Sequence, residues 1–383
     1  MTKSVNLDLV DTDDPRRVEV REWLAAHPDP SADELARAGW VAPGWRRPWG
    51  RGADQLSELI FHDEFDRAGV ALPDNPIGIG WAGPTILAGG TQAQQARYLP
   101  SILDGSAYWC QLFSEPEAGS DLASLRTRAV RDGDTYVIDG QKVWSTWAEH
   151  SDYGILLART DPDAPKHEGI SYFVLPLDAP GVTVLPIREM TGETHFNETF
   201  LEGVRLTADH RIGAENAGWA LAKITLANER LNLARGGVCW GMGPTAADLF
   251  DLIRENGRIA DPLLVQRAAQ LYMEAQILEA LDTRIVAALV AGEEVGPEAS
   301  IKKTFADEFG QRLMELAKDL AGTDGLLDNV GPLGAPVGRW HWGFLFSRAL
   351  TIGGGTSQIQ RSIIAQRVLG LPTEREGRLP KVK

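Results

Sequence analysis

A short polar loop, Phe113-Ser-Glu-Pro-Glu-Ala-Gly-Ser-Asp121, has the residue types of a ligand-binding turn. Ser114 and Ser120 supply hydroxyl donors, and the small residues between them allow a planar or phosphorylated ligand to approach the backbone. A plainer interpretation is a polar connection between a helix and a sheet, in which Gly119 takes an unusual backbone angle. Composition alone favours the plainer interpretation, so the loop has to be weighed together with other motifs.

Two more segments have residues suited to the same kind of ligand. In Gly140-Gln-Lys-Val-Trp-Ser-Thr146, the tryptophan can stack on a ring and the hydroxyls can hydrogen-bond its heteroatoms, although a strand with a core tryptophan has the same pattern. In the segment IGGGTSQIQR at 352–361, three glycines precede a capped helix and expose N–H groups that suit a phosphate or a polarised carbonyl. A flexible helix entry is the plain alternative for that segment.

One carboxylate, that of Glu229, occupies a helical pattern in which a solvated charge is unexpected. Helical spacing places it on one face with five small or mostly apolar residues, namely Ala222, Thr225, Leu226, Leu233 and Gly236. A carboxylate on such a face would be desolvated, as a general base for a weak acid must be. A glutamate beside an arginine on a helix is nevertheless more often a surface residue, so this pattern alone does not decide the role.

These segments must be positioned by helices and strands, and the sequence pattern changes twice along the chain, from helical to strand-like and back to helical. Residues up to about 107 have helical periodicity, with a capping box at Thr91 and Gln94 and a helix stop at Gly105. From about 122 to 207, short apolar runs separated by turn residues predict an antiparallel β unit. The expected strands include residues 136–138, 154–158, 170–175 and 182–186.

Helices return from Trp219 onward, and the stretch 300–322 is strongly helical. The last helix is expected to begin at Ser357, with Gln360 completing a capping box. Gly370 and Pro372 should end it. The chain therefore predicts helices, then strands, then helices again.

Composition limits the classes of function. The 383 residues suit two or three packed units of ordinary globular composition. The net charge of −15 argues against non-specific binding to nucleic acid or to an anionic membrane. Cys110 and Cys239 fit a reducing compartment, and the histidines show no metal-ligand spacing, so we expect no metal. Without a long apolar run or a targeting pattern, we expect a cytoplasmic protein of bacterial type.

Taken in order, the segments match one family over nearly the full length of the chain. The chain resembles the acyl-CoA dehydrogenases in the (S/T)EPxAGSD loop at 114–121, the GxKxWST strand at 140–146 and the GGTSQIQR segment at 354–361. The intervening segments at 169–176, 196–200 and 212–219 are also similar to the family pattern. The resemblance implies an α+β multidomain fold. Its parts are an N-terminal helical domain at 1–108, a central antiparallel β domain at 109–212 and a C-terminal four-helix-bundle-like domain at 213–383.

The resemblance also implies FAD, bound between the β domain and the C-terminal helices. Ser114 would lie near flavin N5 with Phe113 against the ring, while Trp144 and Thr146 would meet the flavin edge. The other implied FAD contacts are Gln266, Gly322, Gly325, Thr356, Ser357 and Gln358, with the two glycines reaching the FAD of a neighbouring subunit. The acyl-CoA substrate would be bordered by Ser120, Arg230, Gly354 and Gly355.

The catalytic base has to be assigned separately, because the family's common arrangement is absent. Many members carry it as the Glu of a Tyr-Glu-Gly-Thr segment, and here that position is Gly354, which has no proton acceptor. Other members, among them branched-chain, long-chain and sterol-side-chain types, place the glutamate in a Glu-Arg pair on the first long C-terminal helix. Ala227-Asn-Glu-Arg-Leu231 is similar to that arrangement. The resemblance thus implies that Glu229 removes the α-proton while hydride passes from the β-carbon to flavin N5.

A second departure concerns assembly. The family's Arg-x-x-Phe-Gly segment, whose Arg reaches the FAD of an adjacent subunit, is replaced by a stretch in which Arg254 or Arg258 would have to substitute. The expected assembly is a homodimer or homotetramer, or an α2β2 heterotetramer with a second subunit of the same family. The expected electron acceptor is an electron-transferring flavoprotein, within lipid metabolism of the fatty-acid β-oxidation type.

Two other functions remain open from the sequence. One is an accessory subunit that supports FAD or substrate on a partner, and Glu229 argues against it because an inactive subunit needs no relocated base. The other is a different flavin oxidoreductase on the same scaffold, such as an oxidase of a non-CoA substrate. The acyl chain also stays open, although Gly354 leaves room for a branched, long or polycyclic group.

Overall fold

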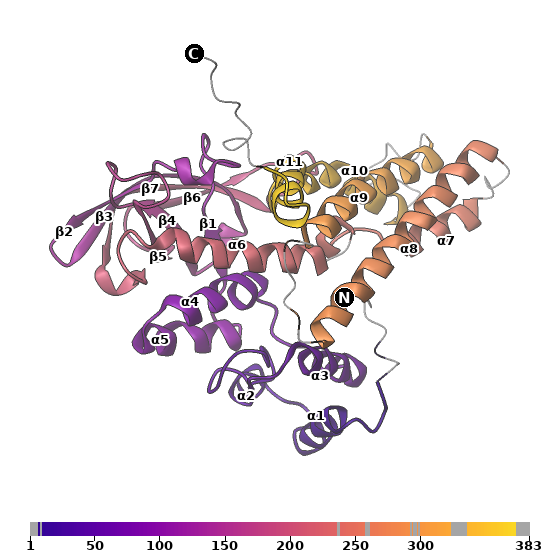
Figure 1. Cartoon of the computed structure of the whole chain (residues 1–383), viewed down its shortest axis with the longest axis horizontal. Coiled ribbons are helices and arrows are strands. Elements are labelled where there is room, and N and C mark those ends of the chain that lie inside the picture. Colours follow the sequence, from indigo (N-terminus) through magenta and orange to yellow (C-terminus); the bar gives the residue numbers. More distant parts are fainter. Residues whose placement is uncertain are drawn as a thin grey trace, which may run out of the picture. The chain divides into compact units, whose positions relative to one another are not determined.

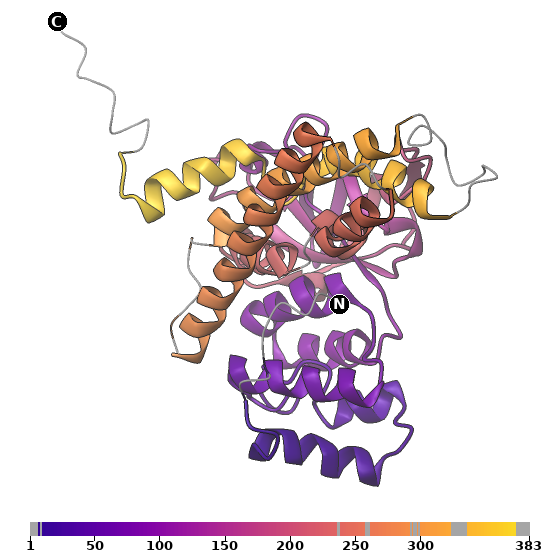
Figure 2. The same ribbon diagram turned by 90° about the vertical axis from the view of Figure 1, so that its right-hand side faces the viewer.

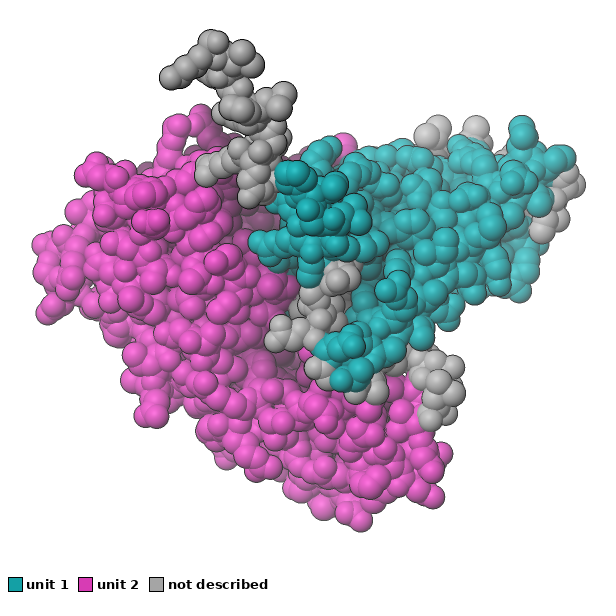
Figure 3. Space-filling view, in the orientation of Figure 1, with its two compact units in different colours: residues 1–6, 230–383 teal, residues 7–229 magenta. Residues whose placement is uncertain are grey.

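The computed structural model describes residues 7, 10–235, 238–256, 261–291, 293, 297, 299–322 and 335–372. The chain divides into two compact units (Figure 3). Unit 2 is residues 7–229, and unit 1 is made mainly of residues 230–383. No helix among these described residues is long and apolar enough to cross a membrane.

Helices form the first part of unit 2, as the sequence predicts. They are α1 (Pro15–Ala26), α2 (Ala32–Arg37), α3 (Gln55–Ala68), α4 (Gly83–Gly89) and α5 (Gln92–Leu103). The capping box at the start of α5 is confirmed, since the Thr91 side chain accepts from the Gln94 amide and the Gln94 side chain accepts from the Thr91 amide. Trp40, Phe61 and Phe65 build a buried aromatic cluster among the first three helices.

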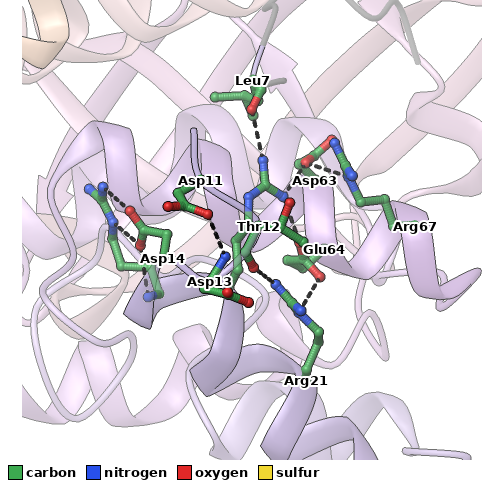
Figure 4. A network of polar contacts seen from close by, with 11 residues as sticks. Leu7, Asp11, Thr12, Asp13, Asp14, Arg21, Asp63, Glu64 and Arg67 are labelled. Atoms are coloured by element: carbon green, nitrogen blue, oxygen red, sulfur yellow. Dashed lines mark hydrogen bonds and ion pairs between the residues drawn. The ribbon is translucent and has the colours of Figure 1, made fainter. Parts of the chain in front are cut away.

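A buried arginine links α1 to α3. Arg17 is 2% exposed and lies within 2.6 Å of Asp63 and 2.5 Å of Glu64, while a second guanidinium nitrogen donates to the Leu7 carbonyl. Arg21 and Arg67 extend this cluster by pairing with Glu64 and Asp63 respectively (Figure 4). A buried charge is tolerated only when it is paired, so these contacts fix the packing of the two helices.

The middle of unit 2 is a β-sheet. In the described part of the chain, eight strands pair in the order β6-β7-β3-β2-β4-β5-β8, and β1 pairs with β4. The pairing is mostly antiparallel, as expected, but β1 is parallel to β4 and β2 joins β4 through one parallel contact. The bounds are β1 (Trp109–Leu112), β2 (Arg128–Asp132), β3 (Thr135–Thr146), β4 (Tyr153–Arg159), β5 (Ile170–Pro176), β6 (Val182–Ile187), β7 (Phe196–Thr207) and β8 (Arg211–Ile212).

Each face of the sheet has its own core. On one face, residues of α4 and α5 pack against β4 and β5, and both views show these helices below the sheet (Figures 1 and 2). The start of α6 (Gly218–Arg235) joins the same core through Leu221 and Ala222. Because α6 is anchored on the sheet, the side chains that follow along this helix have a defined direction.

Unit 1 is helical, as predicted. Its elements are the short turn Val238–Gly241, α7 (Ala246–Asn256), α8 (Pro262–Val290), α9 (Ala299–Ala321), α10 (Ala335–Leu350) and α11 (Ser357–Ile363), which continues as a π-helical turn Ile364–Val368. Helix α9 is central and packs against α7, α8, α10 and α11. Its buried Phe309, Leu313 and Met314 meet Trp340 and Phe346 in one core.

Candidate active site

A β-bulge presents Trp144 at the surface of unit 2. The register of β3 against β7 shifts between Lys142 and Ser145. Trp144 lies in that bulge with a φ of 62°, a conformation that is strained for an aromatic residue. Its side chain is 59% exposed and meets Phe196 edge to face at 6.0 Å. The GxKxWST segment is therefore a strand, but its tryptophan is not a core residue, and its flat face is free to stack on a ring.

Buried polar groups accompany this bulge. Ser145 and Asn197 are opposite each other on β3 and β7, and both are fully buried. Among the described residues, the Ser145 hydroxyl, the Asn197 amide nitrogen and the Thr199 hydroxyl have no hydrogen-bond partner. Buried groups of this kind normally bind ordered water or a ligand, so this region of the sheet fits a polar cofactor. Thr146, the next residue, is half-buried opposite Phe196.

The loop at 114–121 is fixed beside the bulge. The Val143 amide donates to the Ser114 carbonyl at 2.9 Å, so two of the sequence motifs are in direct contact. Beneath them, the fully buried Lys142 donates to Glu115 at 2.8 Å and to the Phe113 carbonyl at 3.1 Å. Glu115 also accepts from the amides of Arg126 and Thr127.

The charges of this pair are set by burial and by each other. Burial lowers the pKa of Lys142 to about 8, although the charge of Glu115 opposes that shift. Burial acts to raise the pKa of Glu115, but the charge and hydrogen bond of Lys142 outweigh it and hold the pKa below its usual range. Sequence reasoning did not single out either residue as an anchor. The only sequence signal was that the loop at 114–121 contains an acid and the strand at 140–146 contains a lysine. Family likeness had linked these two motifs, but not these two side chains.

Two other residues of the loop take different positions. The side chain of Phe113 is 3% exposed and packs edge-on to Tyr172 at 6.0 Å, so its ring belongs to the buried core. Ser120 is exposed at the far end of the loop, beside Asp121, which pairs with Lys166 at 2.6 Å. Whether either residue contacts a ligand stays a prediction.

Glu229 is half-buried on α6 and faces β1. The Gln111 side-chain amide donates to Glu229 Oε2 at 3.3 Å. Gln111 precedes Ser114 by three residues on the same strand and loop. The carboxylate is therefore next to the segment that carries the (S/T)EPxAGSD motif, and it is not a solvated surface group.

A buried hydroxyl network fixes the rotation of α6. Thr225, one turn before Glu229, is fully buried and bonds the Tyr172 hydroxyl at 3.0 Å and the Thr85 hydroxyl at 2.8 Å. Burial raises the pKa of Tyr172 well above its usual value, so this hydroxyl stays neutral. Ala222 is also fully buried, as the helical pattern predicted, while the side chain of Leu233 and the position of Gly236 lie outside the described residues.

A pocket of about 480 Å³ in unit 1 gathers the third motif. Its walls include Thr356, Ser357 and Gln358 at the start of α11, together with Gln311, Arg312 and Arg361. The expected helix start is confirmed, but the cap differs from the prediction. Thr356 is the N-cap and accepts from the Ile359 amide at 3.2 Å. Because Thr356 rather than Ser357 is the N-cap, position N3 is Ile359, and Gln360 instead donates to the Gly354 carbonyl at 2.9 Å.

The remaining described sequence candidates do not line the pocket of unit 1. Gln266 is exposed on α8, and Gly322 is exposed at the end of α9 with a φ of 57°. Arg230 is half-buried on α6, and Gly354 and Gly355 are half-buried with positive φ. Arg254 is exposed and pairs with Asp251. Gly325 and Arg258 lie outside the described residues.

Comparison with known families covers the chain in three consecutive matches. They are the N-terminal domain of acyl-CoA dehydrogenases at residues 11–106, the middle domain at 110–204 and the C-terminal domain at 216–369. The order of helical, β and helical domains is thus confirmed, while the individual boundaries at 108 and 212 stay predictions.

Similar proteins and structures carry the same family name. Acyl-CoA dehydrogenase FadE34 of Mycobacterium tuberculosis is 42% identical over 88% of this chain, which spans 45% of that longer protein. Acyl-CoA dehydrogenase IpdE1 of the same organism is 39% identical over 90% of this chain and 88% of its own length.

Among solved structures, the steroid ACAD Tcur3481-Tcur3483 is 31% identical with a TM-score of 0.77, covering 95% of this chain and 100% of that one. The ChsE4-ChsE5 complex from Mycobacterium tuberculosis is 32% identical with a TM-score of 0.74, covering 94% and 97%. With three matched domains and a relative aligned over nearly its full length, the chain belongs to the acyl-CoA dehydrogenase family, whose members are FAD-dependent oxidoreductases.

Proposed function

We propose that this chain dehydrogenates an acyl-CoA thioester between its α and β carbons, with Glu229 as the catalytic base. The observation that carries the proposal is the position of Glu229 on the inward face of α6, hydrogen-bonded to Gln111 beside the Ser114 loop. A base for a weakly acidic C–H must be close to it and partly desolvated, and the half-buried position of Glu229 agrees with the second condition. Gly354 cannot perform this task, because it has no side chain.

FAD is the cofactor of the proposal, and it would accept hydride from the β-carbon. In unit 2 it would be held by Ser114, Trp144 and Thr146, since the exposed indole offers a stacking face and the orphaned buried hydroxyls nearby offer polar partners. In unit 1 it would be held by Thr356, Ser357 and Gln358, which line a pocket of suitable polarity. The family likeness further assigns Phe113, Gln266, Gly322 and Gly325 to FAD, and Ser120, Arg230, Gly354 and Gly355 to the substrate.

The substrate proposed is a bulky acyl-CoA of steroid type. Support comes from the likeness to a structure named as a steroid ACAD, at 31% identity over 95% of this chain. A glycine at the position where many members have the base removes a side chain from the acyl region, which agrees with a large acyl group. This specificity would differ from the fatty-acid β-oxidation that the resemblance implied.

The proposed working form includes a protein partner. Two similar structures are named as pairs of different chains, Tcur3481-Tcur3483 and ChsE4-ChsE5, which favours a heteromeric assembly over a homodimer or homotetramer. The electron acceptor proposed is an electron-transferring flavoprotein. The two free, buried cysteines agree with the reducing bacterial cytoplasm as the compartment.

The test is anaerobic mixing of the purified protein with a panel of acyl-CoA thioesters while the flavin absorbance is followed. We expect bleaching with at least one steroid-type thioester. Glu229→Gln should keep FAD and acyl-CoA binding and lower the bleaching rate by about 10³-fold or more, because only the proton acceptor is lost. Glu198→Gln, a carboxylate held by Gln141 between β7 and β3, is the matched control and should bleach at the wild-type rate.

An unimpaired Glu229→Gln variant would remove Glu229 from the role of base. Absence of bleaching with every thioester would instead favour the second candidate function, an accessory subunit of a heteromeric dehydrogenase. That candidate is favoured by the paired names of the similar structures. Co-expression with neighbouring genes and the Glu229→Gln change together separate the two cases, since the change abolishes the activity of the complex only if this chain carries the base. Flavin reoxidation by oxygen with a non-CoA substrate would identify a different flavin oxidoreductase.

A further inference from the structure

A buried lysine lies beneath the glycine turn between α10 and α11. Lys303, near the start of α9, is 1% exposed. Its ammonium group donates to the carbonyl oxygens of Leu350 at 3.1 Å, Gly353 at 2.8 Å and Gly355 at 2.9 Å. An ammonium group has three hydrogens, so these bonds use all of them. The lysine thus ties the end of α10 and both ends of the glycine run to α9.

Asp307 balances the charge of this lysine. It lies one turn further along α9, is buried, and places Oδ2 2.7 Å from the lysine nitrogen. Burial raises the pKa of Asp307 to about 7, although the charge of Lys303 opposes that shift. The neighbouring Glu308 is paired with Arg361 of α11. Since the lysine hydrogens are committed to carbonyls, Asp307 acts mainly as a counter-charge.

The glycine turn depends on such contacts for its shape. Gly354 and Gly355 have φ values of 64° and 90°, and a glycine has no side chain with which to pack. The fully buried Gln360 donates to the Gly354 carbonyl at 2.9 Å. Together, Lys303 and Gln360 therefore engage the carbonyls of all three glycines from 353 to 355.

The turn leads directly into one wall of the pocket of unit 1. Thr356, Ser357 and Gln358 follow Gly355 without a break, and the facing wall includes Gln311 and Arg312 of α9. Lys303 belongs to the same helix as that facing wall, so it couples the position of one wall to the other. Burying a lysine is expensive compared with an apolar side chain of similar size. The burial of Lys303 is therefore better explained by a role in positioning the glycine turn than by a gain in the stability of the fold.

We propose that Lys303 is a positioning residue for the cofactor, which holds the glycine turn so that residues 356–358 face bound FAD. The assignment rests on the FAD role proposed above for these residues. Lys303 itself touches only protein groups in this arrangement, and Asp307 serves it as the counter-charge.

The neighbouring lysine provides a matched control. Lys302 is also buried on α9, and it pairs with Asp282 of α8. Lys302→Met with Asp282→Asn removes a buried lysine and its acid, as does Lys303→Met with Asp307→Asn. Only the second pair of changes removes the bonds to the glycine turn. A merely structural role predicts equal effects of the two double variants.

The test compares the full-length wild type, Lys303→Met and the two double variants by FAD titration, flavin fluorescence and thermal unfolding. We expect the Lys303→Met, Asp307→Asn variant to be folded and to bind FAD about tenfold more weakly, whereas the Lys302 control stays within about twofold of wild type. The fluorescence of bound flavin should change in the Lys303 variants only.

Equal FAD affinities in the two double variants would overturn the assignment. Failure of both Lys303 variants to fold, with a folded Lys302 control, would also overturn it, since Lys303 would then act on folding rather than on the position of the turn. A wild-type chain without affinity for FAD, both alone and co-purified with a partner subunit, would refute the proposed function itself, and the wild-type titration distinguishes that outcome.

Discussion

At the scale of single residues, Gln111 explains how Glu229 is held. A neutral amide donor stabilises the ionised carboxylate and fixes its rotamer without adding a competing charge. The contact is 3.3 Å long and partly buried, so it contributes orientation more than stability. Sequence reasoning found the carboxylate by its helical face but not its donor, because Gln111 comes from a strand 118 residues earlier.

Replacement of Gln111 by Leu should therefore affect the proton-transfer step. We expect kcat/KM to fall about tenfold while FAD affinity stays as in wild type, since the base loses the donor that orients it. Gln141→Leu removes a similar amide–carboxylate contact at Glu198, 3.1 Å long, and should leave kcat/KM unchanged. An unchanged kcat/KM in the Gln111 variant, with Glu229→Gln inactive, would show that Gln111 does not act on the base.

At the scale of elements, the bulge in β3 turns a strand into a ligand-binding edge. An unbroken ladder would alternate side chains regularly, but the shift after Lys142 exposes Trp144 while Ser145 stays buried. Trp147, three residues on, also has a positive φ, of 53°, and is 37% exposed. Two strained aromatic residues so close together indicate that this strand end is shaped for binding rather than for pairing.

Trp144→Ala tests this interpretation. We expect FAD to bind about tenfold more weakly, because a stacked aromatic face is lost, while the free energy of unfolding changes by less than about 1 kcal/mol at such an exposed position. Tyr108→Ala, at another exposed aromatic residue of unit 2, is the control and should keep the wild-type FAD affinity. The measurements are FAD titration and urea unfolding. A Trp144 variant that binds FAD as tightly as wild type would place the flavin elsewhere.

At the scale of the whole molecule, buried carboxylates give the two units opposite responses to pH. The pKa of Glu115 in unit 2 is lowered by Lys142, so its contribution to stability is present above the ordinary value of 4.5 and is lost as pH falls through the folded value. The pKa of Asp307 in unit 1 is raised to about 7 by burial, so its contribution is present below the ordinary value of 3.8 and is lost as pH rises through about 7.

Thermal unfolding of full-length variants across pH checks these signs. Glu115→Gln should flatten the loss of stability below the ordinary pKa of 4.5, since the titrating group is gone. Asp307→Asn should flatten the change of stability with pH between pH 3.8 and about 7. Below pH 3.8 its stability should depend on pH as in wild type. Parallel pH curves for wild type and Glu115→Gln would mean that Glu115 is not paired with Lys142 in the folded chain.

The order of helical, β and helical parts could be predicted from the sequence, because local periodicity and turn residues carry that information. Thr91 with Gln94 was enough to place the start of α5, and the apolar runs at 154–158 and 170–175 were enough to place β4 and β5. Helical spacing also predicted the face that Glu229 shares with the buried Ala222 and Thr225, since spacing on one helix is a local property.

Which distant groups meet became visible only in the folded chain. The Lys142–Glu115 pair, the Gln111 contact with Glu229 and the three carbonyls around Lys303 each join residues 27 to 118 positions apart. A lysine or glutamine has the same local pattern whether it is solvated or buried, so no sequence signal separates the two. Strand register and helix packing bring these groups together, and that is why the motifs could be read from the sequence while their anchors could not.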